Sequence, residues 1–267
     1  MKSTHEKSVM MRFSASAGTY QSLAVIQNLV LGKICELFKR GDGRKEHILE
    51  IGCGTGLLTR KIRNYFPNAS IDAIDISPGM IMEARKQFPH DNRIQWITSD
   101  LMDLPGTTTY SLIVSSSSLH WIQPIGAALS RLSGLLAKDG ELIVALMVRG
   151  TLKELRDARQ HVAPNKPPYA QLPSTSEVRY AIYLAGLRIL NFSAGTQHID
   201  YPSTDIFLQQ LHNQGLTGGY FSRSKVALTA RELRQLVTYC NSCYKSNHGI
   251  YASYRTVYVR AKKANDL

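Results

Sequence analysis

Three glycines at alternate positions, Gly52, Gly54 and Gly56, directly follow a short apolar run, Ile48–Ile51. Glycine tolerates positive φ and lets a ligand come close to the backbone, because it has no Cβ. A helical pattern begins at the next residue, so the exposed N–H groups and positive end of that helix would face polar or anionic groups. The stretch predicts a strand, a tight turn and a helix that together hold a cofactor.

Two aspartates lie where later apolar runs end. Asp75 lies at the end of the run 70–76, and Asp100 comes just after the run 93–98. In an open parallel sheet, ligands bind beyond the carboxyl ends of the strands, where the glycine turn also lies. A carboxylate placed there can accept two hydroxyl donors at once, which favours a ligand with a diol. Helix capping or solvation in a loop is the alternative role for each aspartate.

The residues that follow the glycines decide between three kinds of cofactor loop. A phosphate-binding P-loop needs a Lys-Ser or Lys-Thr pair after its last glycine, but Leu57 and Leu58 stand there. A dinucleotide-binding fingerprint needs its third glycine at position 57, which is leucine. The spacing Gly52-x-Gly54-x-Gly56 after Glu50 resembles instead motif I of the class I S-adenosylmethionine (SAM)-dependent methyltransferases.

The resemblance to class I methyltransferases continues over residues 50–121 and implies a role for each landmark. It places Asp75 at the ribose hydroxyls, Asp100 near the adenine amino group, and 115–121 where a fourth strand opens onto the methyl group. The residues expected to bind SAM are therefore Tyr20, Glu50, Gly52, Cys53, Gly54, Gly56, Asp75, Ile76, Asp100, Leu101, Ser115 and Ser116. No metal is expected, because Cys240 and Cys243 form a lone Cys-x-x-Cys pair without a second pair or a histidine partner nearby.

Hydrophobic periodicity predicts the elements that position these residues. Strands are expected at 48–51, 70–76, 93–98, 111–116, 141–147, 188–201 and 253–261, and helices at 21–40, 57–65, 78–88, 125–137, 152–162, 176–185, 204–212 and 230–244. This alternation predicts an α/β, Rossmann-like fold with a seven-stranded, mostly parallel sheet, helices on both faces and a helical lid. We expect one structural domain with an N-terminal flap and helix (1–40), a SAM-binding core (41–150), and a basic, acceptor-facing lid with the last strands (151–267).

Composition and charge limit the possible partners. No apolar run reaches the ~18 residues of a membrane span, and the N-terminus lacks a secretory signal. The four scattered cysteines fit a reducing cytoplasm. Residues 1–148 hold 16 Lys and Arg against 13 Asp and Glu, whereas residues 149–267 hold 16 against 7. This basic second half suggests an acidic partner, such as nucleic acid, a carrier protein or a small acid; a solvated basic surface is the alternative.

The whole chain resembles one group of methyltransferases, the malonyl-[acyl-carrier-protein] O-methyltransferases of biotin synthesis. The segments that carry the resemblance are 12–20, 118–121, 150–155, 211–217, 228–233 and 254–263. The chain departs from that family at His120 (glutamine there), His212 (lysine), Leu216 (alanine) and the patch 163–168. The resemblance implies methylation of the free carboxylate of malonyl-acyl-carrier protein, or malonyl-CoA, and an acyl-carrier protein as partner. We expect a monomer that binds neither nucleic acid nor membrane.

Four residues are candidates for work on the methyl acceptor. The polar, small stretch 12–20, with aromatics at both ends, predicts a flap over the site, and Tyr20 would line the methyl-transfer space. A frayed terminus is the alternative. Arg223 is the first choice for binding the malonyl carboxylate, with Arg149 and His120 as secondary candidates. A carboxylate is ionised near neutral pH, so no general base is needed, and proximity and exclusion of water would drive the reaction.

Other functions stay open on sequence grounds. A different small-molecule methyltransferase could act on another carboxylate, a phenol or a quinone precursor. A nucleic-acid methyltransferase would account for the high isoelectric point of 9.6. The Asp/Asn-Pro-Pro-aromatic tetrapeptide of amino-methylating enzymes is absent, however, because Ser115–Ser118 stands in its place. A SAM-binding regulator without activity is disfavoured, because every cofactor landmark is present.

Overall fold

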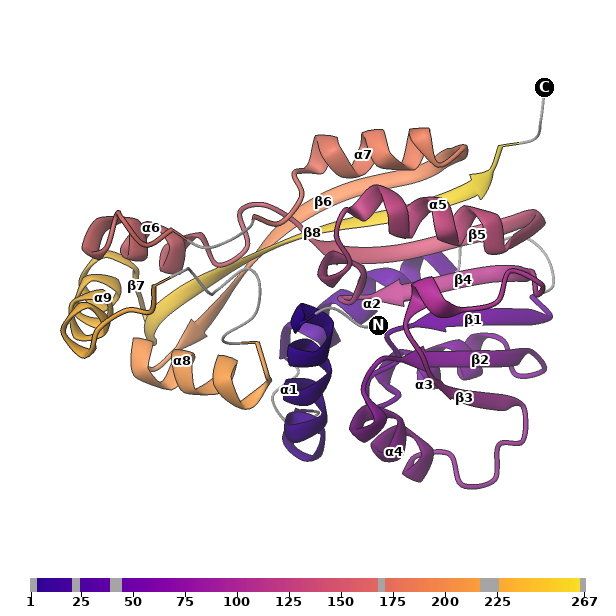
Figure 1. The fold of residues 1–267 in the computed structure, drawn as a ribbon, viewed down its shortest axis with the longest axis horizontal. Coiled ribbons are helices and arrows are strands. Elements are labelled where there is room, and N and C mark those ends of the chain that lie inside the picture. Colours follow the sequence, from indigo (N-terminus) through magenta and orange to yellow (C-terminus); the bar gives the residue numbers. More distant parts are fainter. Residues whose placement is uncertain (1–3, 21–24, 39–44, 168–170, 217–225, 265–267) are drawn as a thin grey trace.

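A computed structural model describes residues 4–20, 25–38, 45–167, 171–216 and 226–264. In this part of the chain one eight-stranded sheet has the order β3-β2-β1-β4-β5-β8-β6, with the two-residue β7 paired to β8 (Figure 1). The strands are β1 (His47–Ile51), β2 (Ser70–Asp75), β3 (Ile94–Thr98), β4 (Tyr110–Ser116), β5 (Leu136–Met147), β6 (Leu187–Tyr201), β7 (Lys245–Ser246) and β8 (Gly249–Lys263). The helices are α1 (Thr4–Tyr20), α2 (Val25–Phe38), α3 (Leu57–Tyr65), α4 (Pro78–Lys86), α5 (Ile125–Leu135), α6 (Lys153–Val162), α7 (Thr175–Leu184), α8 (Thr204–Asn213) and α9 (Ala230–Cys243), with short 3-10 turns η2 (Leu101–Asp103) and η3 (Leu119–Trp121).

Strand direction brings the predicted site residues to one edge of the sheet. The strands β3, β2, β1, β4 and β5 pair in parallel, while β8 runs antiparallel to both β5 and β6. The carboxyl ends of the parallel strands therefore lie together, and so do the segments that follow β1, β2, β3 and β4. The seven-strand, mostly parallel architecture expected from the sequence is confirmed, with β7 as a small addition.

Helices cover both faces of the sheet. Alternating strand residues face opposite sides, so Ile48 packs with α2 and α3 while its neighbour Leu49 packs with α5 and α7. Both side chains are fully buried. A strand that is buried on both faces reads as a continuous apolar run, which explains why Ile48–Ile51 lacks a polar alternation apart from Glu50.

The two longest strands extend beyond the rest of the sheet. β6 pairs with β8 from Ile250 to Lys263, whereas β5 pairs only with Thr256–Lys262 of β8. This two-stranded arm leads to α6, α8 and α9, which gather at one end of the molecule (Figure 1). The buried carboxylate of Glu154 in α6 holds the arm: it accepts hydrogen bonds from the Ser253 hydroxyl and, at 2.9 Å, from the Ser253 N–H. Helices α6, α8 and α9 belong to residues 151–267, and that they act as a lid stays a prediction.

The N-terminal stretch differs from its prediction. Residues 12–20, expected as a polar, small flap or a frayed terminus, are the end of helix α1, and Ser16 and Ala17 are buried. Small side chains let two helices approach closely. The Ser14 hydroxyl lies 2.8 Å from the Ser77 hydroxyl, and a Cβ on Gly79 would lie only 2.9 Å from the Ser14 backbone. Helix α1 therefore packs directly on α4.

Candidate active site

The glycine turn after β1 is held to the neighbouring strand by its backbone. The N–H groups of Gly52 and Cys53 both donate to the carbonyl of Ile74, at 2.9 and 3.0 Å. All three glycines have positive φ. A Cβ on Gly52 would lie 2.2 Å from the Ser118 hydroxyl and one on Gly56 3.0 Å from the Phe88 ring, but a Cβ on Gly54 would meet nothing within 4 Å. Packing thus requires two of the glycines, while Gly54 borders open space.

Asp75 joins the glycine turn to helix α4. Its carboxylate accepts hydrogen bonds from the Gly54 N–H and the Ser77 N–H, each at 2.9 Å. Burial raises the pKa of Asp75, and these two N–H donors oppose that rise. Each carboxylate oxygen can accept a second hydrogen bond. Asp75 can therefore stabilise the turn and still accept two hydroxyl groups of a ligand.

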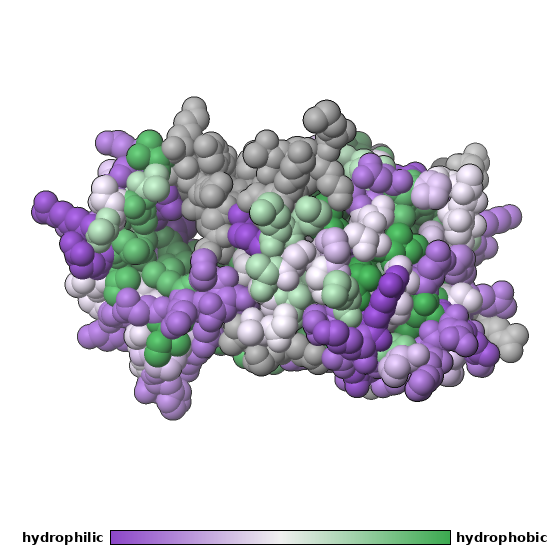
Figure 2. All heavy atoms as spheres, turned by 60° about the horizontal axis from the view of Figure 1, so that its bottom comes forward, coloured by the Kyte–Doolittle hydropathy of each residue, from purple (hydrophilic) through white to green (hydrophobic). Residues whose placement is uncertain are grey.

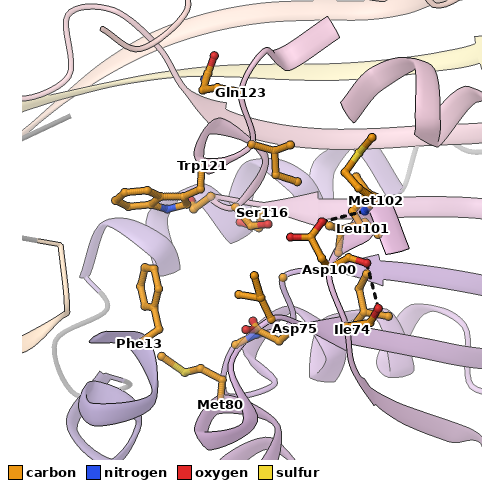
Figure 3. Close-up of a pocket in the computed structure, with 18 of the residues that line it drawn as sticks. Phe13, Ile74, Asp75, Met80, Asp100, Leu101, Met102, Ser116, Trp121 and Gln123 are labelled. Carbon is orange, nitrogen blue, oxygen red and sulfur yellow. Dashed lines mark hydrogen bonds between the residues drawn. The ribbon is translucent and has the colours of Figure 1, made fainter. Parts of the chain in front are cut away.

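A cavity of about 380 Å³ lies beyond the carboxyl ends of the strands. We call it the donor cavity. Eight of the residues expected to bind SAM line it: Tyr20, Gly52, Gly54, Asp75, Ile76, Asp100, Leu101 and Ser116. Asp100 also accepts a hydrogen bond from the Met102 N–H at 2.8 Å, so it caps η2 as well as bordering the cavity. Figure 3 shows Phe13 and Trp121 on the side opposite Asp100 and Met102, with Asp75 between them.

The remaining predicted cofactor residues support the turn from behind. The Glu50 carboxylate is buried and accepts a hydrogen bond from the Thr59 hydroxyl at 2.6 Å, and burial raises its pKa to about 8. Cys53 packs in the core, and the Ser115 hydroxyl donates to the Ile51 carbonyl at 3.0 Å. Glu50, Cys53, Gly56 and Ser115 do not line the donor cavity. Direct contact of these four with a cofactor stays a prediction.

A second cavity of about 330 Å³ adjoins the donor cavity, and we call it the acceptor cavity. Four residues line both: Phe13, Tyr20, Ser117 and Trp121. The Phe13 ring meets the Trp121 ring edge to face at 5.7 Å between centroids, and the Tyr20 ring at 6.2 Å. These four residues form the junction of the two cavities. α1 supplies two of them and the segment after β4 supplies the other two.

Hydroxyl groups at the junction are available to a ligand. Tyr20 accepts a hydrogen bond from the Gln27 side-chain amide at 3.2 Å, which leaves its own O–H proton free to donate. Burial raises the pKa of Tyr20 to about 12, so the phenol stays protonated at neutral pH. Within the described segments, the buried hydroxyls of Ser116 and Ser117 have no hydrogen-bond partner.

His120 faces the acceptor cavity and is 4% exposed. Burial lowers the pKa of His120 to about 3, so the imidazole is neutral at physiological pH. Its Nδ1 has no hydrogen-bond partner among the residues that the structure describes. A neutral imidazole can donate or accept one hydrogen bond here, but it does not supply a positive charge.

The structure assigns different arginines to the acceptor cavity from those that the sequence suggested. Arg149 is exposed, lies 3.2 Å from the Glu177 carboxylate and lines neither cavity. Arg223 lies outside the described residues. Arg156 and Arg159, both from α6, line the acceptor cavity. Their spacing from Leu152 and Leu155 places all four on one helix face, and this is the signal in the sequence that could have revealed them.

Helix hydropathy and the placement of possible metal ligands can be examined in the described residues. Among the helices in this part of the chain, none has both the length and the hydropathy of a membrane span. Cys240 is buried and Cys243 exposed, and both are free thiols. Over the same described ranges, no group of three or more His, Cys, Asp or Glu side chains is placed to hold a metal ion.

Comparison with known proteins shows a likeness to methyltransferases. Residues 49–142 match the family described as "Methyltransferase domain". The malonyl-[acyl-carrier protein] O-methyltransferase of Halalkalibacterium halodurans is 29% identical over 95% of this chain and 97% of that protein. Malonyl-[acyl-carrier protein] O-methyltransferase 1 of Ilyobacter polytropus is 32% identical, over 60% of this chain and 59% of its own length. The chain is a class I SAM-dependent methyltransferase.

Solved structures agree with this fold. The YcgJ protein from Bacillus subtilis matches 87% of this methyltransferase and 98% of its own chain, with a TM-score of 0.63 and 14% identity. The N-methyltransferase NodS from Bradyrhizobium japonicum, in complex with S-adenosylhomocysteine (SAH), matches 92% of this chain and 99% of its own, with a TM-score of 0.52 and 15% identity. SAM is the cofactor. The open space at Gly54 and the acids Asp75 and Asp100 in the donor cavity fit its ribose and adenine.

Proposed function

We propose that this methyltransferase transfers the methyl group of SAM to the free carboxylate of a malonyl thioester on acyl-carrier protein, or on CoA, and so forms a methyl ester. The observation that carries the proposal is the pair of cavities that meet at Tyr20 and Ser117. One cavity has the acids that suit the cofactor, and the other opens toward the basic second half of the chain. The names of the relatives support malonyl-acyl-carrier protein as the acceptor. The family resemblance of the sequence implies an early step of biotin synthesis as the setting.

Residues of the donor cavity would hold SAM by three kinds of contact. Asp75 would accept hydrogen bonds from the ribose hydroxyls, and Asp100 would bind the adenine amino group. The glycine turn would admit the amino-acid portion beside Gly54. The ring faces of Phe13 and Trp121 would lie near the positive sulfonium, since the face of an aromatic ring attracts cations. When bound, SAM supplies the methyl group and is left as SAH.

The junction would orient the acceptor carboxylate. The O–H groups of Tyr20 and Ser117 can each donate a hydrogen bond to one of its oxygens. Neutral donors hold a carboxylate in place without cancelling its negative charge, so an oxygen lone pair stays available to attack the methyl carbon. A carboxylic acid of ordinary pKa is already ionised at neutral pH, so no residue has to remove a proton. Catalysis would then depend on alignment of the two reactants.

The walls of the acceptor cavity would exclude water from the reaction. Most of them are apolar, and the polar His120 is neutral. A dry site strengthens the hydrogen bonds at the junction and prevents water from solvating the carboxylate. The neutral His120 would donate a hydrogen bond to the thioester carbonyl, in keeping with its place among the predicted acceptor-side residues.

A labelling experiment tests the proposal. The purified protein is incubated with methyl-labelled SAM and, in separate reactions, with malonyl-acyl-carrier protein, malonyl-CoA, malonic acid, a phenol and RNA. We expect label on the malonyl thioesters, in a form that dilute base releases as methanol because it is an ester. Acetyl-acyl-carrier protein is the matched control, since it lacks the free carboxylate and should stay unlabelled. Label on the phenol or on RNA alone would contradict the proposal.

A further inference from the structure

The two arginines of the acceptor cavity lie on a different wall from the junction. Helix α6, which carries Arg156 and Arg159, packs mainly on α9 and β8, whereas α1, which carries Tyr20, packs on α4 and α8. Figure 1 shows α6 at the far end of the molecule and α1 beside the edge of the sheet where the donor cavity lies. A ligand that reaches from Tyr20 to these arginines must therefore extend along the acceptor cavity.

The charges around the arginines leave this wall positive. In the described part of the chain, the Arg156 guanidinium has no hydrogen bond or ion pair, and the charges that act on it are those of Arg149 and of the exposed Asp157. Arg159 donates to the Lys166 carbonyl at 2.7 Å. The neighbouring Glu232 is already paired with the Lys166 ammonium, at 2.7 Å. Burial lowers the pKa of both arginines, which indicates that neither guanidinium is fully hydrated.

The surface between the junction and the arginines is apolar. Figure 2 shows hydrophobic side chains gathered at the end of the molecule that carries α6, α8 and α9. The cavity walls there are mostly leucines, from four segments: Leu152, Leu155, Leu172, Leu208, Leu211, Leu228, Leu233 and Leu236. Such a surface can pack against an uncharged chain, but it offers no partner for a charge. The ligand that fits has an anion at each end and an uncharged stretch between them.

A malonyl group on its carrier arm has this pattern. We propose that Arg156 and Arg159 bind the phosphate of the phosphopantetheine arm, while the carboxylate to be methylated lies at the Tyr20 junction. The inference rests on the proposed function. An arginine fork suits phosphate, because two parallel N–H groups can bind two of its oxygens. The same fork on the reacting carboxylate would occupy the lone pairs that must attack the methyl group. Binding at the phosphate gives affinity for the carrier without that cost.

Two substrates that differ only in the phosphate test the assignment. Malonyl-phosphopantetheine and malonyl-pantetheine are compared with the unaltered protein and with Arg156→Gln. We expect kcat/KM for malonyl-phosphopantetheine to fall about ten- to hundredfold in the variant, since this is the usual effect of losing a hydrogen bond to a charged group. The value for malonyl-pantetheine should be unchanged. Arg156→Lys, which keeps the charge but not the fork, should give an intermediate loss for the phosphorylated substrate alone.

Controls separate this result from misfolding and from failure of the proposed function. Lys153→Gln removes a charge from the exposed side of the same helix and should leave both substrates unaffected. The affinity for SAH, measured by calorimetry, reports whether each variant is folded. An equal loss with both substrates would overturn the inference and place the arginines at the carboxylate. Equal kcat/KM for the two substrates in the unaltered protein would also overturn it. If the unaltered protein methylates neither substrate and also leaves malonyl-acyl-carrier protein and malonyl-CoA unlabelled, the proposed function itself fails.

Discussion

The two cavities are built in different ways. The donor cavity is formed mainly by segments that directly follow parallel strands, and its essential contacts are backbone N–H groups bound to Ile74 and Asp75. The acceptor cavity is formed by side chains of α1, α6, α8 and α9, which come from widely separated parts of the chain. The donor site is therefore a consequence of the sheet topology, whereas the acceptor site depends on how appended helices pack around it.

This difference explains how one fold can serve many acceptors. Changes in α6, α8 or α9 alter the acceptor cavity without touching the turn at Gly54. Helix α1 is the exception, because Phe13 and Tyr20 border both cavities. Variants in one cavity, in α1, or at Glu50 behind the glycine turn therefore test whether the donor and acceptor cavities are built independently. The largest effects are expected from variants in the donor cavity.

Asp75→Ala should abolish most of the binding of cofactor. The variant removes the acceptor for two backbone N–H groups and for the ribose hydroxyls, so we expect the Kd for SAH to rise at least about a hundredfold by calorimetry. Asp72→Asn is the matched control, since Asp72 lies on the same strand but accepts from the Tyr110 hydroxyl, outside the cavities. An unchanged Kd in Asp75→Ala would refute the ribose role.

Tyr20→Phe should slow the reaction with the acceptor and leave the binding of the cofactor unchanged. The ring that borders both cavities is retained, and only the hydroxyl at the junction is lost. We expect kcat/KM for malonyl-acyl-carrier protein to fall about ten- to hundredfold, with the Kd for SAH unchanged. Tyr183→Phe, on an exposed tyrosine of α7, controls for loss of a phenol and should have no effect. A parallel loss of SAH affinity would place the Tyr20 hydroxyl on the donor side instead.

Gly79→Ala should disturb both cavities at once. The added Cβ would lie 2.9 Å from the backbone of Ser14, so α1 must shift away from α4. Overpacking of this kind costs about 1–3 kcal/mol, and the shift moves Phe13 and Tyr20 together. The midpoint temperature of thermal unfolding and kcat/KM should both decrease. Gly134→Ala is the control, because a Cβ there meets nothing within 4 Å. Full activity of Gly79→Ala would show that α1 does not need its packing on α4.

Glu50→Gln should change how stability depends on pH. The folded-state pKa of Glu50 is raised to about 8 from an ordinary value of 4.5, so its protonated form is favoured in the native protein. Its stabilising effect is complete below about pH 4.5 and is lost as the pH rises toward 8, at about 1.4 kcal/mol per pH unit. Glutamine does not ionise, so the variant does not lose stability in this way. Chemical denaturation should therefore show that the free energy of unfolding of the variant, relative to the unaltered protein, increases from about pH 4.5 to about pH 8. Parallel curves for the two proteins would contradict a buried, protonated Glu50.

The elements around the donor cavity follow from the sequence because local rules determine them. The turn at Gly52–Gly56 and the aspartate at the end of β2 follow from strand period, glycine conformation and the position of strand ends in a parallel sheet. Helix α3 begins and ends at Leu57 and Tyr65, as expected. Cys53 and Ser115 do not line the donor cavity, because Cys53 packs in the core and the Ser115 hydroxyl donates to the Ile51 carbonyl; their contact with the cofactor stays a prediction.

The acceptor region could not be derived in the same way. Helical spacing puts Arg156 on one face of α6, but only the packing of α6 against α9 and β8 makes that face line a cavity. The polar, small side chains of the stretch 12–20 predicted a flap or a frayed terminus and not a packed helix. In the structure that smallness is what allows α1 to contact α4 at Ser14. Contacts between segments distant in sequence decide both cases.

A crystal structure of the protein with SAH bound would test most directly whether the donor and acceptor cavities meet at the point of methyl transfer. We predict that the ribose hydroxyls hydrogen-bond to Asp75 and that the sulfur faces the junction, beside Tyr20 and Ser117, where the acceptor cavity begins. SAH bound with its sulfur turned away from the junction, or bound outside the donor cavity, would contradict the account.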